Sequence, residues 1–163
     1  MIKGVAVIGR TSKNNREYSE KALQQIADLM QFGVRVFCDH KPERSVRDLA
    51  GYLRNAVVEN KNKVKADFKV MPSNKWIFDL ATEMPFGCGF SIVGKGKTYI
   101  ENGVEKVEEV PSLQSCDLVS FPATTKGLFE AERKFNENEE PCEFYQKAEG
   151  HPSIYPSQEP LSA

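Results

Sequence analysis

The segment Lys63–Val70 alternates polar and apolar residues at every step and carries the clearest secondary-structure signal in the chain. A period of two gives a strand with one face on the core and one face in water. Shorter apolar runs predict further strands at 4–9, 34–38, 97–101, 104–110 and 116–121. Because strands outnumber helices and do not alternate strictly with them, we expect an α+β or barrel-like architecture, not a doubly wound parallel sheet.

Two segments have the apolar spacing of amphipathic helices. The first resembles a helix that starts near Asn14 and continues to about residue 32. Ser73 can cap the second, whose apolar residues keep helical spacing as far as Met84. Asn102-Gly103 predicts a tight hairpin turn between the two strands that flank it.

The end of the chain differs in composition from the rest. Residues 1–129 carry 19 Lys and Arg against 15 Asp and Glu, a charge of +4, whereas residues 130–163 carry 3 against 8, a charge of −5. Four of the nine prolines also fall in the last 23 residues. Such material buries too little apolar surface to offset chain entropy. We therefore predict a folded domain over 1–130 and a flexible, acidic, Pro-rich C-terminal extension over 131–163.

Composition argues against several classes of function. No apolar run approaches the roughly 20 residues that cross a bilayer, and no secretory signal is visible, so we expect a cytosolic protein with no membrane partner. The positive charge of the body is spread out and not clustered with aromatic residues, which argues against a nucleic-acid partner. The four cysteines form no close pair and the chain has only two histidines, so we expect no metal and no cofactor.

Ser91 lies in the uncharged, glycine-rich segment 86–94. Neighbouring glycines let a substrate backbone approach closely, and apolar surroundings keep water from a nucleophile. The alternative is a bulged, buried strand in which the Ser91 hydroxyl bonds a nearby carbonyl, and the local sequence taken alone favours that alternative. A phosphate-binding loop is set aside, because neither register of the glycines fits and a hairpin follows in place of a helix.

His40 lies where the predicted strand 34–38 becomes a loop, a place where a half-exposed polar histidine is more common than a base. The other histidine, His151, falls in the acidic extension, so any Ser/His mechanism takes His40 as its general base. Asp117 interrupts an apolar strand, and it either faces water or needs a partner such as an imidazole. We interpret Cys38 as a buried thiol and not as a nucleophile.

Four pieces of the chain, in this order, resemble the prohead, or capsid-maturation, proteases of tailed bacteriophages, distant relatives of the herpesvirus assemblin. The resemblance covers about residues 1–130, and its pieces are Val36–His40, Arg44–Tyr52, Gly89–Gly94 and Cys116–Ala123. It implies a serine endopeptidase with Ser91 as nucleophile and His40 as general base. Asp117 is the best match for the group that orients the imidazole, and Ser115 competes for that position.

The resemblance also implies a fold and a setting. The fold is a strand-rich closed β-barrel surrounded by helices, as in the herpesvirus proteases. The substrates are scaffold and major capsid protein segments, cleaved during procapsid maturation in the host cytoplasm, inside the assembling procapsid. We expect an oxyanion hole at the backbone amides of Ala123–Thr125. No cofactor is implied, and a homo-oligomer is compatible with the sequence.

The chain departs from the family in one respect and leaves a second function open. Many relatives carry a long helical scaffold domain after the protease, whereas here only the acidic extension follows. The alternative function is a catalytically silent capsid-assembly or scaffold-binding module with the same fold. The presence of both Ser91 and His40 argues against that alternative.

Overall fold

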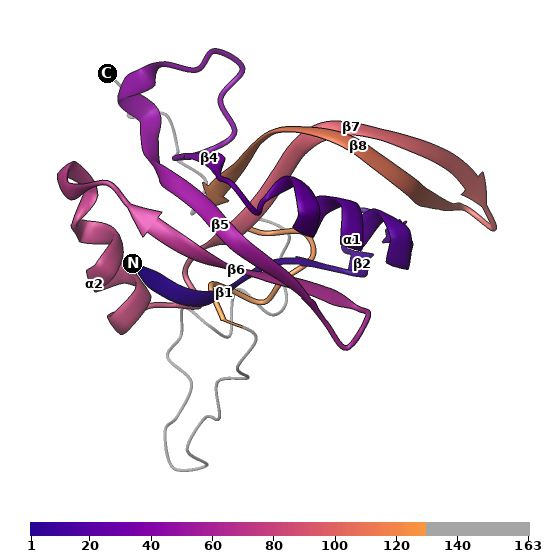
Figure 1. Cartoon of the computed structure of the whole chain (residues 1–163), viewed down its shortest axis with the longest axis horizontal. Coiled ribbons are helices and arrows are strands. Elements are labelled where there is room, and N and C mark those ends of the chain that lie inside the picture. The colour runs from indigo at the N-terminus through magenta and orange to yellow at the C-terminus, as the bar shows by residue number, and fades with distance from the viewer. Residues whose placement is uncertain (130–163) are drawn as a thin grey trace, which may run out of the picture. The chain divides into compact units, whose positions relative to one another are not determined.

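The computed structural model describes residues 1–129, and the predicted extension 131–163, with His151, lies outside the described residues. The described part is rich in strands (Figure 1). The strands are β1 (Ile2–Gly9), β2 (Thr11–Ser12), β3 (Arg16–Tyr18), β4 (Val34–Phe37), β5 (Leu49–Glu59), β6 (Lys63–Val70), β7 (Gly89–Glu101) and β8 (Val104–Val119). The helices are α1 (Glu20–Leu29) and α2 (Trp76–Glu83), with short 3₁₀ turns at Val46–Asp48 and Pro72–Asn74.

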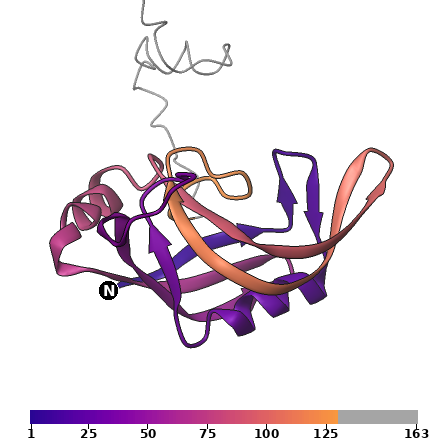
Figure 2. The ribbon, with the colours of Figure 1, turned by 90° about the horizontal axis from the view of Figure 1, so that it is seen from above.

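The strands form two four-stranded sheets. The first has the order β1-β6-β5-β4 and is antiparallel throughout. The second has the order β2-β3-β8-β7, and only its β3–β8 pair is parallel. Phe68 and Phe90, one from each sheet, are fully buried and meet edge to face with their ring centroids 5.3 Å apart. The core therefore lies between the sheets, and α1 covers the convex side of the curved β7–β8 hairpin (Figure 2).

The predicted closed barrel surrounded by helices is wrong. Neither sheet closes, and residues 1–129 contain only two α-helices. A barrel needs its edge strands to pair, but β1 is interrupted by two register shifts and by Gly4 at φ +64°. The amide of Ala6 donates instead to the carbonyl of Leu128 at 2.7 Å, in the segment that follows β8. The chain is a mixed α+β protein with open sheets.

Two local predictions are confirmed. β6 has the bounds predicted from the alternating segment, and its apolar residues are the buried ones. The hairpin turn lies at Asn102-Gly103, where both residues have positive φ, 51° and 76°, as a two-residue turn of this kind requires. The flanking strands are longer than predicted, because β8 joins the separately predicted strands at 104–110 and 116–121 into one.

Both helices begin later than predicted. Asn15 has φ +56° and belongs to the turn between β2 and β3, so it cannot lie in a helix. The cap of α1 is Ser19, whose hydroxyl accepts a hydrogen bond from the Ala22 amide at 3.0 Å. Ser73 lies in a 3₁₀ turn that starts at Pro72, and α2 begins after it without a side-chain cap. Apolar spacing identified the helices but not their first residues.

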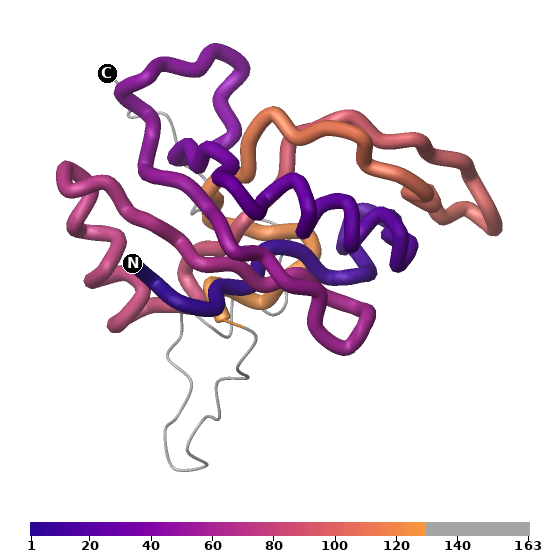
Figure 3. Tube along the Cα trace, viewed as in Figure 1, coloured from indigo at the N-terminus to yellow at the C-terminus, as the bar shows by residue number. Residues whose placement is uncertain are grey.

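One junction between the sheets positions the loop that carries His40. Cys38, just past β4, forms a parallel bridge with Leu118 of β8, and the Asp39 amide donates to the Leu118 carbonyl at 2.8 Å. The loop from 38 to 48 leaves from this junction and returns to β5 (Figure 3). Its first residues are therefore held against β8.

Candidate active site

Ser91 and Asp117 are brought together by the pairing of β7 with β8. The two residues are directly opposite in the antiparallel register. Side chains of directly opposed residues project from the same face of a sheet and lie about 5 Å apart. The candidate nucleophile and the candidate carboxylate are thus neighbours through backbone pairing alone.

His40 lies between these two side chains. Its Nε2 is 2.8 Å from the Ser91 Oγ, and its Nδ1 is 2.5 Å from the Asp117 Oδ2. Asp39, with φ +66°, turns the chain away from β8 and directs the next residue over the β7–β8 pair. The structure therefore brings together all three residues that were predicted from the sequence as catalytic.

The hydrogen bonds assign the proton positions on the imidazole. A carboxylate oxygen only accepts, so the Nδ1 of His40 carries the proton and donates it to Asp117. In the neutral imidazole the Nε2 is then unprotonated and accepts from the Ser91 hydroxyl, 2.8 Å away. In this tautomer the imidazole can remove the hydroxyl proton, which is the first requirement for a serine nucleophile.

The bulge predicted as the alternative for the glycine-rich segment is also present. The β7–β8 register shifts between Val93 and Gly94, two residues beyond Ser91. A Cβ on Gly94 would lie 2.4 Å from the Ser112 carbonyl oxygen, so this close approach requires glycine. The partner of the Ser91 hydroxyl is nevertheless His40 and not a backbone carbonyl.

Arg44 holds the Asp117 carboxylate from its other side. Asp117 is fully buried, and the Arg44 guanidinium lies 2.6 Å from its Oδ1 and 2.5 Å from its Oδ2. The same guanidinium donates to Ser115 at 2.8 Å and stacks over the Phe37 ring at 5.0 Å. Ser115, which competed with Asp117 in the sequence, therefore contacts Arg44 and not the imidazole.

Arg44 was not predicted as a site residue. The available signal was the buried acid itself, because a buried carboxylate needs a cationic or hydrogen-bonding partner. Arg44 lies four residues after His40, in the loop that the Cys38–Leu118 bridge anchors to β8. A cation close in sequence to the predicted histidine is therefore the expected partner of this acid.

Two of the three residues predicted as oxyanion donors lie at the same cavity as the serine. Ala123 and Thr124 line, together with Ser91, a cavity of about 50 Å³. Within the described residues the amides of 123–125 donate to no other group. The buried Thr125 hydroxyl likewise has no partner. This segment therefore has unused donors near Ser91, as an oxyanion hole requires.

The three cysteines in the described part of the chain are poor nucleophiles. Burial, aided by the nearby Asp39 and Asp48 carboxylates, raises the pKa of the Cys38 thiol. Burial raises the pKa of Cys88 to about 11 and holds the pKa of Cys116 well above its ordinary value. Thiolates are the reactive form, and few are present near neutral pH.

We predict that alkylation of Cys88 by iodoacetamide is slow near neutral pH and accelerates about tenfold per pH unit below its pKa. Peptide mapping of the labelled chain measures this rate. Under the mild conditions that leave Cys88 unlabelled, any activity that uses Ser91 as its nucleophile should be unaffected by the reagent. Loss of cleavage on thiol labelling, combined with full cleavage by Ser91→Ala, would identify a cysteine nucleophile instead.

Comparisons of the chain with protein families, with curated proteins and with solved structures find no match. Among residues 1–129, no three His, Cys, Asp or Glu side chains are grouped as a metal site would need. No helix in that range has the length and apolarity to cross a membrane.

Proposed function

We propose that the chain is a serine endopeptidase with Ser91 as nucleophile, His40 as general base and Asp117 as the residue that orients the base. The observation that carries this proposal is a continuous chain of hydrogen bonds. It runs from the Ser91 hydroxyl through both ring nitrogens of His40 to the Asp117 carboxylate. Such a chain of hydrogen bonds, with the base oriented by a third group, is the arrangement by which a weak hydroxyl nucleophile is activated.

In the first half of the reaction, the Ser91 Oγ attacks the carbonyl carbon of the scissile peptide bond while the His40 Nε2 takes the hydroxyl proton. The resulting oxyanion accepts hydrogen bonds from the amides at 123–125. The C–N bond then breaks, His40 returns the proton to the leaving amine, and the acyl group stays on Ser91. In the second half a water molecule, deprotonated by His40, attacks the ester and releases the carboxylic acid and the free serine.

Asp117 and Arg44 act on this chemistry through His40. The carboxylate fixes the tautomer with the proton on Nδ1 and stabilises the imidazolium that forms during each proton transfer. Arg44 contacts both carboxylate oxygens and also donates to Ser115, so the buried acid is held in one orientation. Arg44 is therefore a positioning residue, two steps removed from the reacting atoms.

Asp117→Asn should lower the cleavage rate by about 10⁴-fold, because the asparagine amide donates to Nδ1 and stabilises the wrong imidazole tautomer. The rate of substrate cleavage and a thermal melt measure the effect and the integrity of the fold. Asp79→Asn, at an exposed position of α2, is the matched control and should cleave like the wild type. An unchanged rate for Asp117→Asn would remove the orienting role from that residue.

The substrates we propose are scaffold and major capsid protein segments, cut during procapsid maturation inside the assembling procapsid. This part of the proposal rests on the sequence resemblance to prohead proteases over residues 1–130. The closed barrel that the resemblance implied is absent, so the support comes from the site and the four sequence pieces and not from the overall fold.

Co-expression of the chain with the scaffold and major capsid proteins of the same virus tests the proposal. We expect shortened capsid and scaffold bands on a gel with the wild-type chain. Intact bands with normal procapsid assembly would instead support the catalytically silent assembly module. N-terminal sequencing of the shortened bands would identify the cleaved bonds.

A further inference from the structure

The strand that carries Ser91 has a free edge. β7 is the last strand of its sheet, paired with β8 on one side and, within residues 1–129, with no strand on the other. It is 13 residues long, and its residues become exposed from Gly94 onward. The unpaired backbone N–H and C=O groups of such an edge can pair with an added strand.

A pocket lies on the face of the sheet that β3, β8 and β7 share, so it reaches as far as this edge strand. It has a volume of about 260 Å³, and alternate residues of β7 contribute to its lining: Ile92, Gly94, Gly96 and Thr98. Alternate residues of a strand face the same side of the sheet. The pocket shares Arg16, Tyr18 and Ile92 with the small cavity at Ser91, so the two cavities are adjacent.

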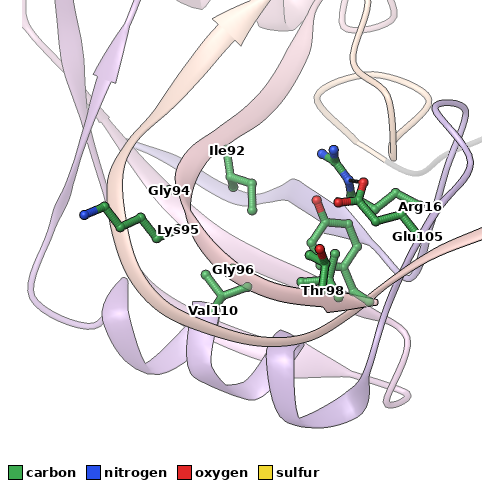
Figure 4. Close-up of a pocket in the computed structure, with 10 residues that line it drawn as sticks. Arg16, Ile92, Gly94, Lys95, Gly96, Thr98, Glu105 and Val110 are labelled. Carbon is green, nitrogen blue, oxygen red and sulfur yellow. Dashed lines mark hydrogen bonds and ion pairs between the residues drawn. The ribbon is translucent and has the colours of Figure 1, made fainter. Parts of the chain in front are cut away.

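Two of the three charged residues that line the pocket are paired with each other. Arg16 and Glu105 form an ion pair at 2.7 Å at one end of the pocket. Figure 4 shows this pair on the inner side of the curved β7–β8 hairpin, whereas the side chain of Lys95 extends away from it. A charged side chain that entered would meet both signs of charge, and the oppositely charged group is already engaged in the pair. The pocket therefore suits an uncharged side chain.

We infer that the peptide substrate binds in an extended conformation as an additional strand on the free edge of β7, with one uncharged side chain in the pocket under Ile92–Thr98. Backbone hydrogen bonds to β7 place the scissile bond beside Ser91, and the pocket selects one side chain near that bond. This inference rests on the proposed protease activity and adds the class of substrate, which is an unfolded segment and not a folded surface.

Backbone methylation of a peptide substrate tests the strand addition. A proteome-derived peptide library is incubated with the full chain, and the fastest-cleaved decapeptide is resynthesised with a single N-methyl group at each position in turn. Methylation at alternate residues should lower kcat/KM by about tenfold or more, because those amides bond β7, and methylation at the residues between should change it by less than about twofold. A decrease without period two would overturn the strand addition.

Gly96→Val tests the pocket. A Cβ at Gly96 would lie 3.4 Å from the Val107 Cγ1 and 3.3 Å from the Glu109 carbonyl oxygen, so the valine enters the pocket with small adjustments. At one position of the cleaved library peptides, the wild-type chain should prefer uncharged residues of medium size over Lys, Arg, Asp and Glu. The variant should shift that preference by about tenfold toward Gly and Ala, because the pocket volume is lost.

Lys69→Val is the control for adding a β-branched residue to a strand. Lys69 is exposed on β6, in the other sheet, and its replacement should leave the preference unchanged. An unaltered preference in Gly96→Val, with a wild-type melting temperature, would overturn the pocket assignment.

The library and methylation experiments distinguish a failure of this inference from a failure of the protease proposal. Library cleavage that Ser91→Ala abolishes, combined with a flat methylation profile, would leave the protease in place and overturn the strand addition. Library cleavage that persists in Ser91→Ala, or no cleavage of any peptide by the wild-type chain, would contradict the proposed protease and the inference together.

Discussion

Replacing Ser91 by alanine should abolish cleavage of the capsid and scaffold proteins, with a loss of about 10⁶-fold in kcat. The variant keeps the β7–β8 pairing, because the pairing uses only backbone groups at this position. It removes the one hydroxyl that the His40 Nε2 contacts, and no acyl intermediate can then form. A gel of the co-expressed proteins, followed by kinetics on the library-derived peptide, measures the loss.

Ser112→Ala is the matched control for this experiment. Ser112 is exposed on β8, and its replacement should leave processing unchanged. Thermal melts of both variants should agree with that of the wild type, since neither side chain contributes to the core. Identical processing by Ser91→Ala and the wild-type chain would end the protease proposal.

Replacing His40 by alanine should cause a loss of similar size, again about 10⁶-fold, because nucleophile and base act as a unit. The double variant Ser91→Ala/His40→Ala should be no worse than either single variant, since removing the second member of a unit costs little more. Such non-additivity distinguishes a catalytic pair from two residues that independently support the fold. Cleavage kinetics of the three variants provide the comparison.

His151 offers the matched control for the base. It is the only other histidine in the chain, and its position falls in the predicted acidic extension. His151→Ala should cleave at the wild-type rate. Normal cleavage by His40→Ala would remove the base assignment, and loss of cleavage in His151→Ala would transfer that assignment to the second histidine.

The sequence was sufficient to predict that Ser91, His40 and Asp117 meet at the site. The scarcity of histidine limited the choice of base, and the resemblance then supplied Ser91 and Asp117 as its partners. The structure brings these three residues within hydrogen-bond distance. Local patterns also located β6 and the Asn102-Gly103 hairpin, because alternation and turn chemistry depend only on neighbouring residues.

Sheet closure could not be predicted in the same way. Whether edge strands pair depends on contacts between segments far apart in the chain, such as the hydrogen bond from Ala6 to Leu128. Arg44 was missed for a related reason, since its partner Asp117 lies 73 residues away and the resemblance implied no role for the arginine. The helix start at Ser19 was missed because the short strands β2 and β3 occupy residues that carry a helix-like pattern. In each case a long-range contact prevailed over a local preference.

Labelling with a fluorophosphonate tests the central claim most directly. An activated serine attacks the phosphorus of this probe, fluoride leaves, and a stable phosphonyl ester remains on the oxygen. We predict a single adduct on the full chain, located on Ser91 by peptide mapping, and at least about 10³-fold slower labelling in His40→Ala. The absence of an adduct on the folded wild-type chain, or an adduct on another residue, would contradict the assignment of Ser91 as an activated nucleophile.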